Sequence, residues 1–142
     1  MIELIDPIIS SNKVDISTGL NVHYLEASKN NNNQPIALLL HGFPELSFSW
    51  RKIIPILAYE GFRVIAPDMR GYGLTSGGTK KYNTNISEYR LLNLTTDILS
   101  LISALKINKV DLLVGHDAGS SVAGTSALIR PDIFKSVVMM SA

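Results

Sequence analysis

Hydrophobic residues along the chain gather in short, nearly continuous runs, separated by longer stretches with helical spacing. Three runs lie at residues 36–40, 63–67 and 110–114, and a fourth at 136–141 contains two valines and two methionines. Runs of this length are typical of strands that are buried on both faces of a sheet. We therefore predict a strand at each of the four positions.

The clearest helical spacing runs from Tyr89 to Leu105. Apolar residues recur there at steps of three and four positions, so they share one face of a helix. We expect Asn108 to close this helix. A second, small-residue helix should follow the 110–114 strand and run to about Arg130.

The N-terminal part of the chain has a different pattern. Polar and apolar residues alternate at 13–17 and 20–27, as in an antiparallel hairpin. A helix should then begin at Ser47 or Ser49 and stop near Gly61. A hairpin followed by strands that alternate with helices predicts an α/β fold. We expect a mostly parallel sheet with an N-terminal antiparallel hairpin and helices on both faces.

Composition narrows the possible functions. The 142 residues suffice for one modest domain, and 46% of them are hydrophobic. Lys plus Arg total 13 and Asp plus Glu total 12, a balance that argues against a nucleic-acid or anionic-membrane binder. The chain has no cysteine, which excludes disulfides, thiolate metal sites and a cysteine nucleophile. With no recognisable signal peptide, a cytoplasmic location is expected.

The most informative stretch follows the 110–114 strand and reads Gly115-His116-Asp117-Ala118-Gly119. Glycines on both sides allow a sharp turn from strand to helix, with Asp117 at its tip. Free backbone N–H groups at the start of the next helix can receive negative charge. A carboxylate there can attack an electrophilic carbon directly and form an ester. The five residues alone leave a second interpretation open, in which Asp117 is only a helix N-cap.

Two other segments follow predicted strands in the same way. They are His41-Gly42-Phe43 and Asp68-Met69-Arg70. Ligands of parallel sheets bind at the carboxyl ends of the strands, so these segments and Asp117 should converge. A nucleotide site at Gly71-Tyr72-Gly73 is disfavoured, because Ser76 stands where a dinucleotide fingerprint needs its third glycine.

Three motifs in this order resemble the N-terminal half of the α/β-hydrolase superfamily. They are H-G-F-P-E at 41–45, D-M-R-G-Y-G-L-T-S at 68–76 and G-H-D-A-G at 115–119. The branch they resemble most contains soluble epoxide hydrolases and haloalkane or haloacid dehalogenases, which use an aspartate nucleophile. The resemblance covers nearly the whole chain from about Leu20 onward.

This resemblance implies a role for each matching residue. Asp117 would be the catalytic nucleophile, and the backbone N–H groups of Phe43 and Ala118 would form the oxyanion hole. His41 and Pro44 would shape the loop beside it.

The substrate follows from the same resemblance. His41, Pro44 and Tyr72 would bind it, although an aromatic residue beside a sheet is more often part of the core. The partner would be a small-molecule epoxide or organohalide, with no cofactor, metal, nucleic acid or membrane. Related dehalogenases often carry tryptophan where this chain has Ala118. The H-G-F-P-E motif is common in epoxide hydrolases, so epoxide hydrolysis is favoured over the dehalogenase-like alternative.

The resemblance also implies what lies outside the chain. The water-activating histidine, its acid and the cap tyrosines of the family all follow the nucleophile. Here the three histidines are His23, His41 and His116, all before Asp117. We expect residues 1–142 to be the N-terminal part of a single α/β-hydrolase domain, without the cap domain and C-terminal part. Such a fragment should be inactive alone; a non-catalytic α/β-hydrolase-derived fragment is the other alternative.

Overall fold

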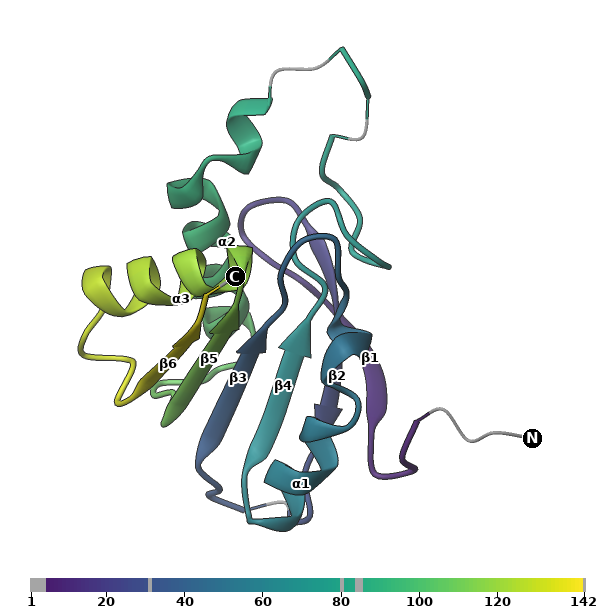
Figure 1. The fold of residues 1–142 in the computed structure, drawn as a ribbon, viewed down its shortest axis with the longest axis vertical. Coiled ribbons are helices and arrows are strands. Elements are labelled where there is room, and N and C mark those ends of the chain that lie inside the picture. Colours follow the sequence, from purple (N-terminus) through teal and green to yellow (C-terminus); the bar gives the residue numbers. More distant parts are fainter. Residues whose placement is uncertain (1–4, 31, 80, 84–85, 142) are drawn as a thin grey trace.

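A computed structural model describes residues 5–30, 32–79, 81–83 and 86–141, which form a single sheet with helices on both faces (Figure 1). The strands in this part of the chain are β1 (Ser10–Asp15), β2 (Asn21–Ala27), β3 (Ile36–Leu40), β4 (Arg63–Pro67), β5 (Leu112–His116) and β6 (Val137–Met140). The α-helices are α1 (Ile53–Tyr59), α2 (Leu91–Ala104) and α3 (Ala118–Ile129). The described residues also form the short 3-10 helices η1 (Ser47–Trp50) and η2 (Ile86–Tyr89).

The strand order across the sheet is β1-β2-β4-β3-β5-β6. β2 pairs antiparallel with both β1 and β4, and the remaining neighbours are parallel. The predicted fold class, a mostly parallel sheet with an N-terminal antiparallel hairpin, is confirmed. In the register of β3 and β5, Leu40 lies opposite Gly115, so the carboxyl ends of these two strands are neighbours.

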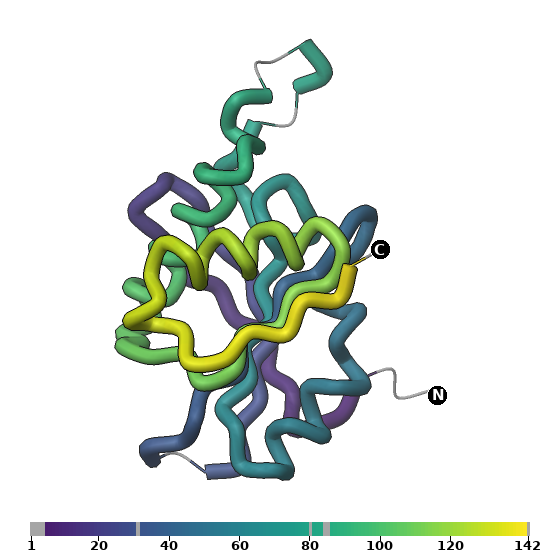
Figure 2. Tube along the Cα trace, turned by 60° about the vertical axis from the view of Figure 1, so that its left-hand side comes forward, coloured from purple at the N-terminus to yellow at the C-terminus, as the bar shows by residue number. Residues whose placement is uncertain are grey.

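Alternate residues of the central strands pack against opposite helical layers. Leu38 and Leu40 face a core built with α2 and α3, whereas Leu39 faces η1 and α1. In Figure 2, α3 (yellow-green) lies across the sheet next to β6 (yellow), and α1 (blue-teal) lies away from α3. The residues that fill the first layer from the helices are Ile98, Ile102, Val122 and Ala123. Because both faces are covered, the β3 strand is apolar at every position, as the sequence indicates.

Several element boundaries differ from the prediction. β5 occupies Leu112–His116 rather than 110–114. β1 occupies Ser10–Asp15 rather than 13–17, because the hairpin turn takes the later residues and buries Ile16. The prediction that Asn108 closes the long helix is wrong. α2 ends at Ala104, and Lys106 adopts a positive φ of 56° that turns the chain.

The helix predicted from Ser47 or Ser49 is divided into η1 and α1. Pro55 explains why α1 begins only at Ile53. A proline is tolerated in the first turn of a helix, where its missing N–H group would have no partner in any case. Gly61 ends this segment with a φ of 102°, as predicted.

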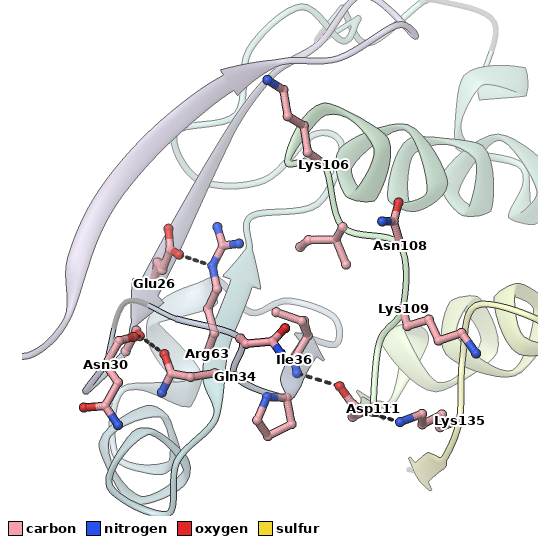
Figure 3. A pocket seen from close by; sticks show the side chains of 14 residues that line it. Glu26, Asn30, Gln34, Ile36, Arg63, Lys106, Asn108, Lys109, Asp111 and Lys135 are labelled. Atoms are coloured by element: carbon pink, nitrogen blue, oxygen red, sulfur yellow. Dashed lines mark hydrogen bonds and ion pairs between the residues drawn. The ribbon is translucent and has the colours of Figure 1, made fainter.

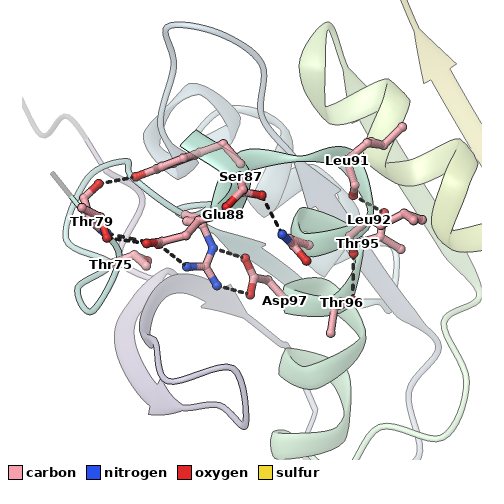
Figure 4. A network of polar contacts seen from close by, with 12 residues as sticks. Thr75, Thr79, Ser87, Glu88, Leu91, Leu92, Thr95, Thr96 and Asp97 are labelled. Atoms are coloured by element: carbon pink, nitrogen blue, oxygen red, sulfur yellow. Dashed lines mark hydrogen bonds and ion pairs between the residues drawn. The ribbon is translucent and has the colours of Figure 1, made fainter. Parts of the chain in front are cut away.

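A buried ion pair anchors the glycine-rich 68–79 loop to α2. Arg70 donates to both carboxylate oxygens of Asp97, at 2.7 and 2.8 Å, and to Glu88 at 3.0 Å. Both side chains of the Arg70–Asp97 pair are less than one-tenth exposed. Figure 4 shows this network between η2, α2 and the loop that carries Thr79.

We predict that Arg70→Met destabilises the fold by about 3–5 kcal/mol, because it leaves the Asp97 carboxylate buried without its partner. The free energy of unfolding in urea measures this. The double variant Arg70→Met with Asp97→Leu is the control and should be much closer to wild type, since it removes both charges. Equal losses in the single and double variants would contradict this account.

β6 has a strand neighbour on one side only within the described residues, and its side chains are apolar. Val138 is 45% exposed and Met139 is 58% exposed. An apolar edge without charges offers free backbone groups to another chain.

We therefore predict that the 142-residue chain self-associates through β6 and that Val138→Lys reduces the association. Light scattering at several protein concentrations measures it. Leu92→Lys introduces the same charge at an exposed position of α2 and should leave association unchanged. A similar decrease in both variants would point to net charge rather than to the edge.

Candidate active site

Asp117 lies at the tip of a tight turn between β5 and α3, with φ 53° and ψ −120°. A positive φ is unfavourable for a residue with a side chain. The flanking glycines leave no room for a Cβ atom: one added to Gly115 would lie 2.3 Å from the Gly119 carbonyl oxygen. One added to Gly119 would lie 2.4 Å from the Leu40 carbonyl oxygen. Both glycines are therefore required by the close packing of the turn, as the sequence indicates.

The Asp117 carboxylate contacts the loop after β3. Its Oδ1 accepts a hydrogen bond from the Phe43 N–H group at 2.9 Å. The side chain makes no capping hydrogen bond to α3. The pKa of Asp117 is lowered, first by the Phe43 N–H and then by the Ala118 N–H. The two backbone donors named from the sequence thus both act on this carboxylate.

His41 is fully buried and joins two of the three sequence motifs. Its Nε2 accepts a hydrogen bond from the Met69 N–H at 3.0 Å, so its Nδ1 carries the proton and donates to the Gly42 carbonyl at 2.9 Å. Burial lowers the pKa of His41, which favours this neutral form. The ring shapes the 41–45 loop from beneath.

The other residues predicted to bind substrate lie nearer the surface. Pro44 is exposed, and so is the neighbouring Phe43, whose side chain is 69% exposed. Tyr72 is half-buried and meets the His41 ring edge-on, with ring centroids 5.0 Å apart. The pKa of Tyr72 is raised, first by burial and then by the negative charge of Asp117. The tyrosine therefore belongs to the surroundings of the carboxylate, although it also packs against the core.

The structure gives contacts to Glu45 and His23, two residues for which the sequence predicted no role. The Glu45 carboxylate accepts from the Gly42 N–H and contacts His116 Nδ1, each at 3.1 Å. The only sequence signal for this was the presence of Glu45 in H-G-F-P-E. His23 is a buried residue of β2, and its Nδ1 lies 2.7 Å from Asp68, a contact that sequence spacing does not reveal.

Asp68 holds the second motif in place. Its carboxylate accepts backbone hydrogen bonds from Ser47 at 2.8 Å and Leu74 at 3.0 Å. Gly73 adopts a φ of 52°, and an added Cβ would meet the Asp68 carboxylate. Charge-assisted hydrogen bonds from the Asp68 carboxylate to the backbone therefore anchor this loop.

A polar hollow of about 710 Å³ lies at the end of the sheet where β3 and β4 begin, away from Asp117. Figure 3 shows the side chains that line it. Its lining includes residues that begin or precede strands, among them Ile36, Arg63 and Asp111. Two of its ion pairs, Glu26–Arg63 and Asp111–Lys135, neutralise charge within it. This hollow is separated from Asp117 by the length of the strands and takes no part in the candidate site.

The described part of the chain has neither a metal-binding cluster nor a helix of membrane-spanning length and hydrophobicity. It contains no group of three or more His, Asp or Glu side chains that could hold a metal ion. None of its helices is long and apolar enough to cross a membrane.

A mostly parallel sheet in which one strand ends in a glycine-flanked turn with a nucleophile-type side chain is the arrangement of α/β hydrolases. Residues 35–142 match the family described as alpha/beta hydrolase fold, and the chain belongs to this family. An epoxide hydrolase of Caballeronia sordidicola is 42% identical over 128 residues, which are 89% of this chain and 36% of that protein. Epoxide hydrolase B of Mycobacterium tuberculosis is 39% identical over 123 residues, 87% of this chain and 33% of that protein.

Solved structures give the same picture. Epoxide hydrolase VrEH1 from Vigna radiata has a TM-score of 0.83 at 38% identity, and the match covers 95% of this chain and 40% of that one. Potato (Solanum tuberosum) epoxide hydrolase I has a TM-score of 0.80 at 37% identity, and the match covers 91% of this chain and 38% of that one. The chain is homologous to epoxide hydrolases and spans about a third of the length of the curated relatives described above.

We predict that Gly42→Ala pushes the loop after β3 away from the turn that carries Asp117. The added Cβ would lie 2.5 Å from the Asp117 Cβ and 2.9 Å from the His116 carbonyl oxygen. We expect the Phe43–Asp117 hydrogen bond to break, with a loss of about 1–3 kcal/mol of stability from overpacking. The Phe43 amide shift in a ¹H–¹⁵N spectrum and urea unfolding measure these changes.

Gly78→Ala is the matched control, because its added Cβ would lie no closer than 3.4 Å to its neighbours. It should leave the Phe43 amide unchanged. A Gly42→Ala spectrum that matches wild type would mean that the loop and the turn are not in this close contact.

Proposed function

We propose that Asp117 is the nucleophile of an epoxide-opening hydrolytic reaction. The carboxylate oxygen attacks a ring carbon and the carbon–oxygen bond of the epoxide breaks. The released alkoxide takes a proton from solvent water, so that a hydroxyalkyl ester of Asp117 forms. The observation that carries the proposal is the Phe43 N–H bond to Asp117 at 2.9 Å, on a side chain that does not cap α3.

The backbone donors support this role in two ways. In the resting protein they lower the pKa of Asp117. The carboxylate therefore stays in its ionised, nucleophilic form at pH values where an ordinary aspartate would begin to take up a proton. When water attacks the ester carbonyl, the Phe43 and Ala118 N–H groups are arranged to stabilise the oxyanion. The epoxide substrate is inferred from the relatives, which are named epoxide hydrolases.

The hydrolysis step needs a base that activates water. His23 and His41 are buried and hydrogen-bonded to groups other than Asp117, and His116 contacts Glu45. None of the three is arranged to deliver water to an ester of Asp117. We therefore propose that residues 1–142 supply the nucleophile and the oxyanion hole of one hydrolase domain, and that they form the ester without turning it over. The cytoplasmic location expected for this protein rests on the sequence alone.

Covalent labelling of the 142-residue chain tests this proposal. With a small reactive epoxide such as styrene oxide, we expect the intact mass to rise by the whole mass of the epoxide, at the peptide that contains Asp117. Asp117→Asn should abolish the adduct while keeping the fold, since asparagine tolerates a positive φ. Asp132→Asn removes an exposed carboxylate elsewhere and should label like wild type.

The same assay separates the two chemistries considered for this site. A primary alkyl halide would add only its alkyl group, with release of halide. Labelling by the halide and not by the epoxide would favour the dehalogenase-like alternative. Equal epoxide labelling of wild type and Asp117→Asn would refute the nucleophile.

A further inference from the structure

The Phe43 N–H group lies within a turn in which Glu45 forms two hydrogen bonds with Gly42, one through its backbone and one through its side chain. The Glu45 N–H donates to the Gly42 carbonyl at 3.0 Å, and the Gly42 N–H donates to the Glu45 Oε2 at 3.1 Å. The direction of the Phe43 N–H is therefore set by a short ring of backbone and side-chain bonds. Loss of the Glu45 carboxylate would open one side of that ring.

The same carboxylate oxygen reaches across to the strand that carries the nucleophile. Glu45 Oε2 lies 3.1 Å from His116 Nδ1, and His116 directly precedes Asp117. One oxygen thus connects the loop after β3 with the end of β5, next to the Phe43–Asp117 hydrogen bond. The Glu45 and His116 side chains are 33% and 40% exposed, so this link lies at the rim of the site.

We propose that Glu45 is a positioning residue, which holds the Phe43 N–H group against the Asp117 carboxylate through its contacts with Gly42 and His116. The side chain of Glu45 bonds Gly42 and His116 rather than Asp117, so it acts through the backbone of the turn. Its meaning for catalysis rests on the proposed function, whereas its effect on the geometry does not. Donors of an oxyanion hole act only within a narrow distance range, so the anchoring of the turn bears directly on that hole.

Charge and position have opposite effects on Asp117, and this makes the proposal testable. If Glu45 were only a nearby negative charge, removing it would lower the pKa of Asp117, because an adjacent anion disfavours ionisation. If Glu45 holds the Phe43 N–H in place, its removal weakens the main hydrogen bond that lowers this pKa, and the pKa rises.

The experiment is a ¹³C NMR titration of the Asp117 carboxyl in the 142-residue chain, together with the Phe43 amide shift. Glu45→Gln removes the charge but keeps one oxygen that can accept from both Gly42 and His116. We expect its Phe43 amide to resemble wild type and the pKa of Asp117 not to rise. Glu45→Ala removes the acceptor, and we expect the Phe43 amide to move upfield and the pKa of Asp117 to rise.

Two further variants complete the design. Glu45→Asp keeps the charge but is one methylene too short for both contacts, so a raised pKa there can come only from geometry; it also serves if Glu45→Ala does not fold. Glu60→Ala removes an exposed glutamate at the end of α1 and should change neither readout. A pKa of Asp117 that falls or stays unchanged in both Glu45→Ala and Glu45→Asp would overturn the proposal.

Labelling with styrene oxide separates this inference from the proposed function. We expect about tenfold slower adduct formation in Glu45→Ala and a near wild-type rate in Glu45→Gln, as misplacement of a reacting group predicts. Adduct formation in wild type with no effect of Glu45→Ala on any readout would refute the positioning role alone. No adduct in wild type, with a raised pKa of Asp117 in Glu45→Ala, would refute the nucleophile and leave the positioning role intact.

Discussion

The close approach between the end of β3 and the turn after β5 is the constraint on which the rest of the site depends. The parallel register places Leu40 opposite Gly115, so the residues that follow both strands meet at one edge of the sheet. Side chains are excluded from this contact at Gly42, Gly115 and Gly119. As a result, a backbone N–H of one segment reaches the carboxylate of the other, and Asp117 is held at an unfavourable positive φ.

Buried polar groups stabilise this contact from the side. His41 bonds the backbone of both the first and the second motif, and Asp68 accepts two backbone N–H groups and contacts His23. Arg70 extends the same network to α2 through Asp97. Buried polar groups with their partners in place rigidify a structure, and a rigid surround is what a strained turn requires. The geometry of the site thus rests on neighbours that make no hydrogen bond to Asp117.

Much of the fold could be predicted because its signals are local. Strands β3, β4 and β6 are short apolar runs, and α2 is a long amphipathic segment, so hydrophobic spacing locates them. The prediction was weaker for β1, whose residues are polar and which is recognised by pairing with β2 rather than by its own pattern. The end of α2 was also missed, because a lysine rather than a glycine adopts the left-handed conformation there.

The sequence by itself determined the order of the elements, the glycines of the turn and the carboxylate at its tip, because these depend on residues close together in the chain. The tertiary structure decided which distant groups meet. The family resemblance had indicated that the Phe43 N–H lies near Asp117, and the structure supplies the bond itself, between residues 74 positions apart. The contact from Glu45 to His116, 71 positions apart, had no such indication. Such contacts follow from strand order and register, which cooperative packing of the whole sheet sets and no local pattern encodes.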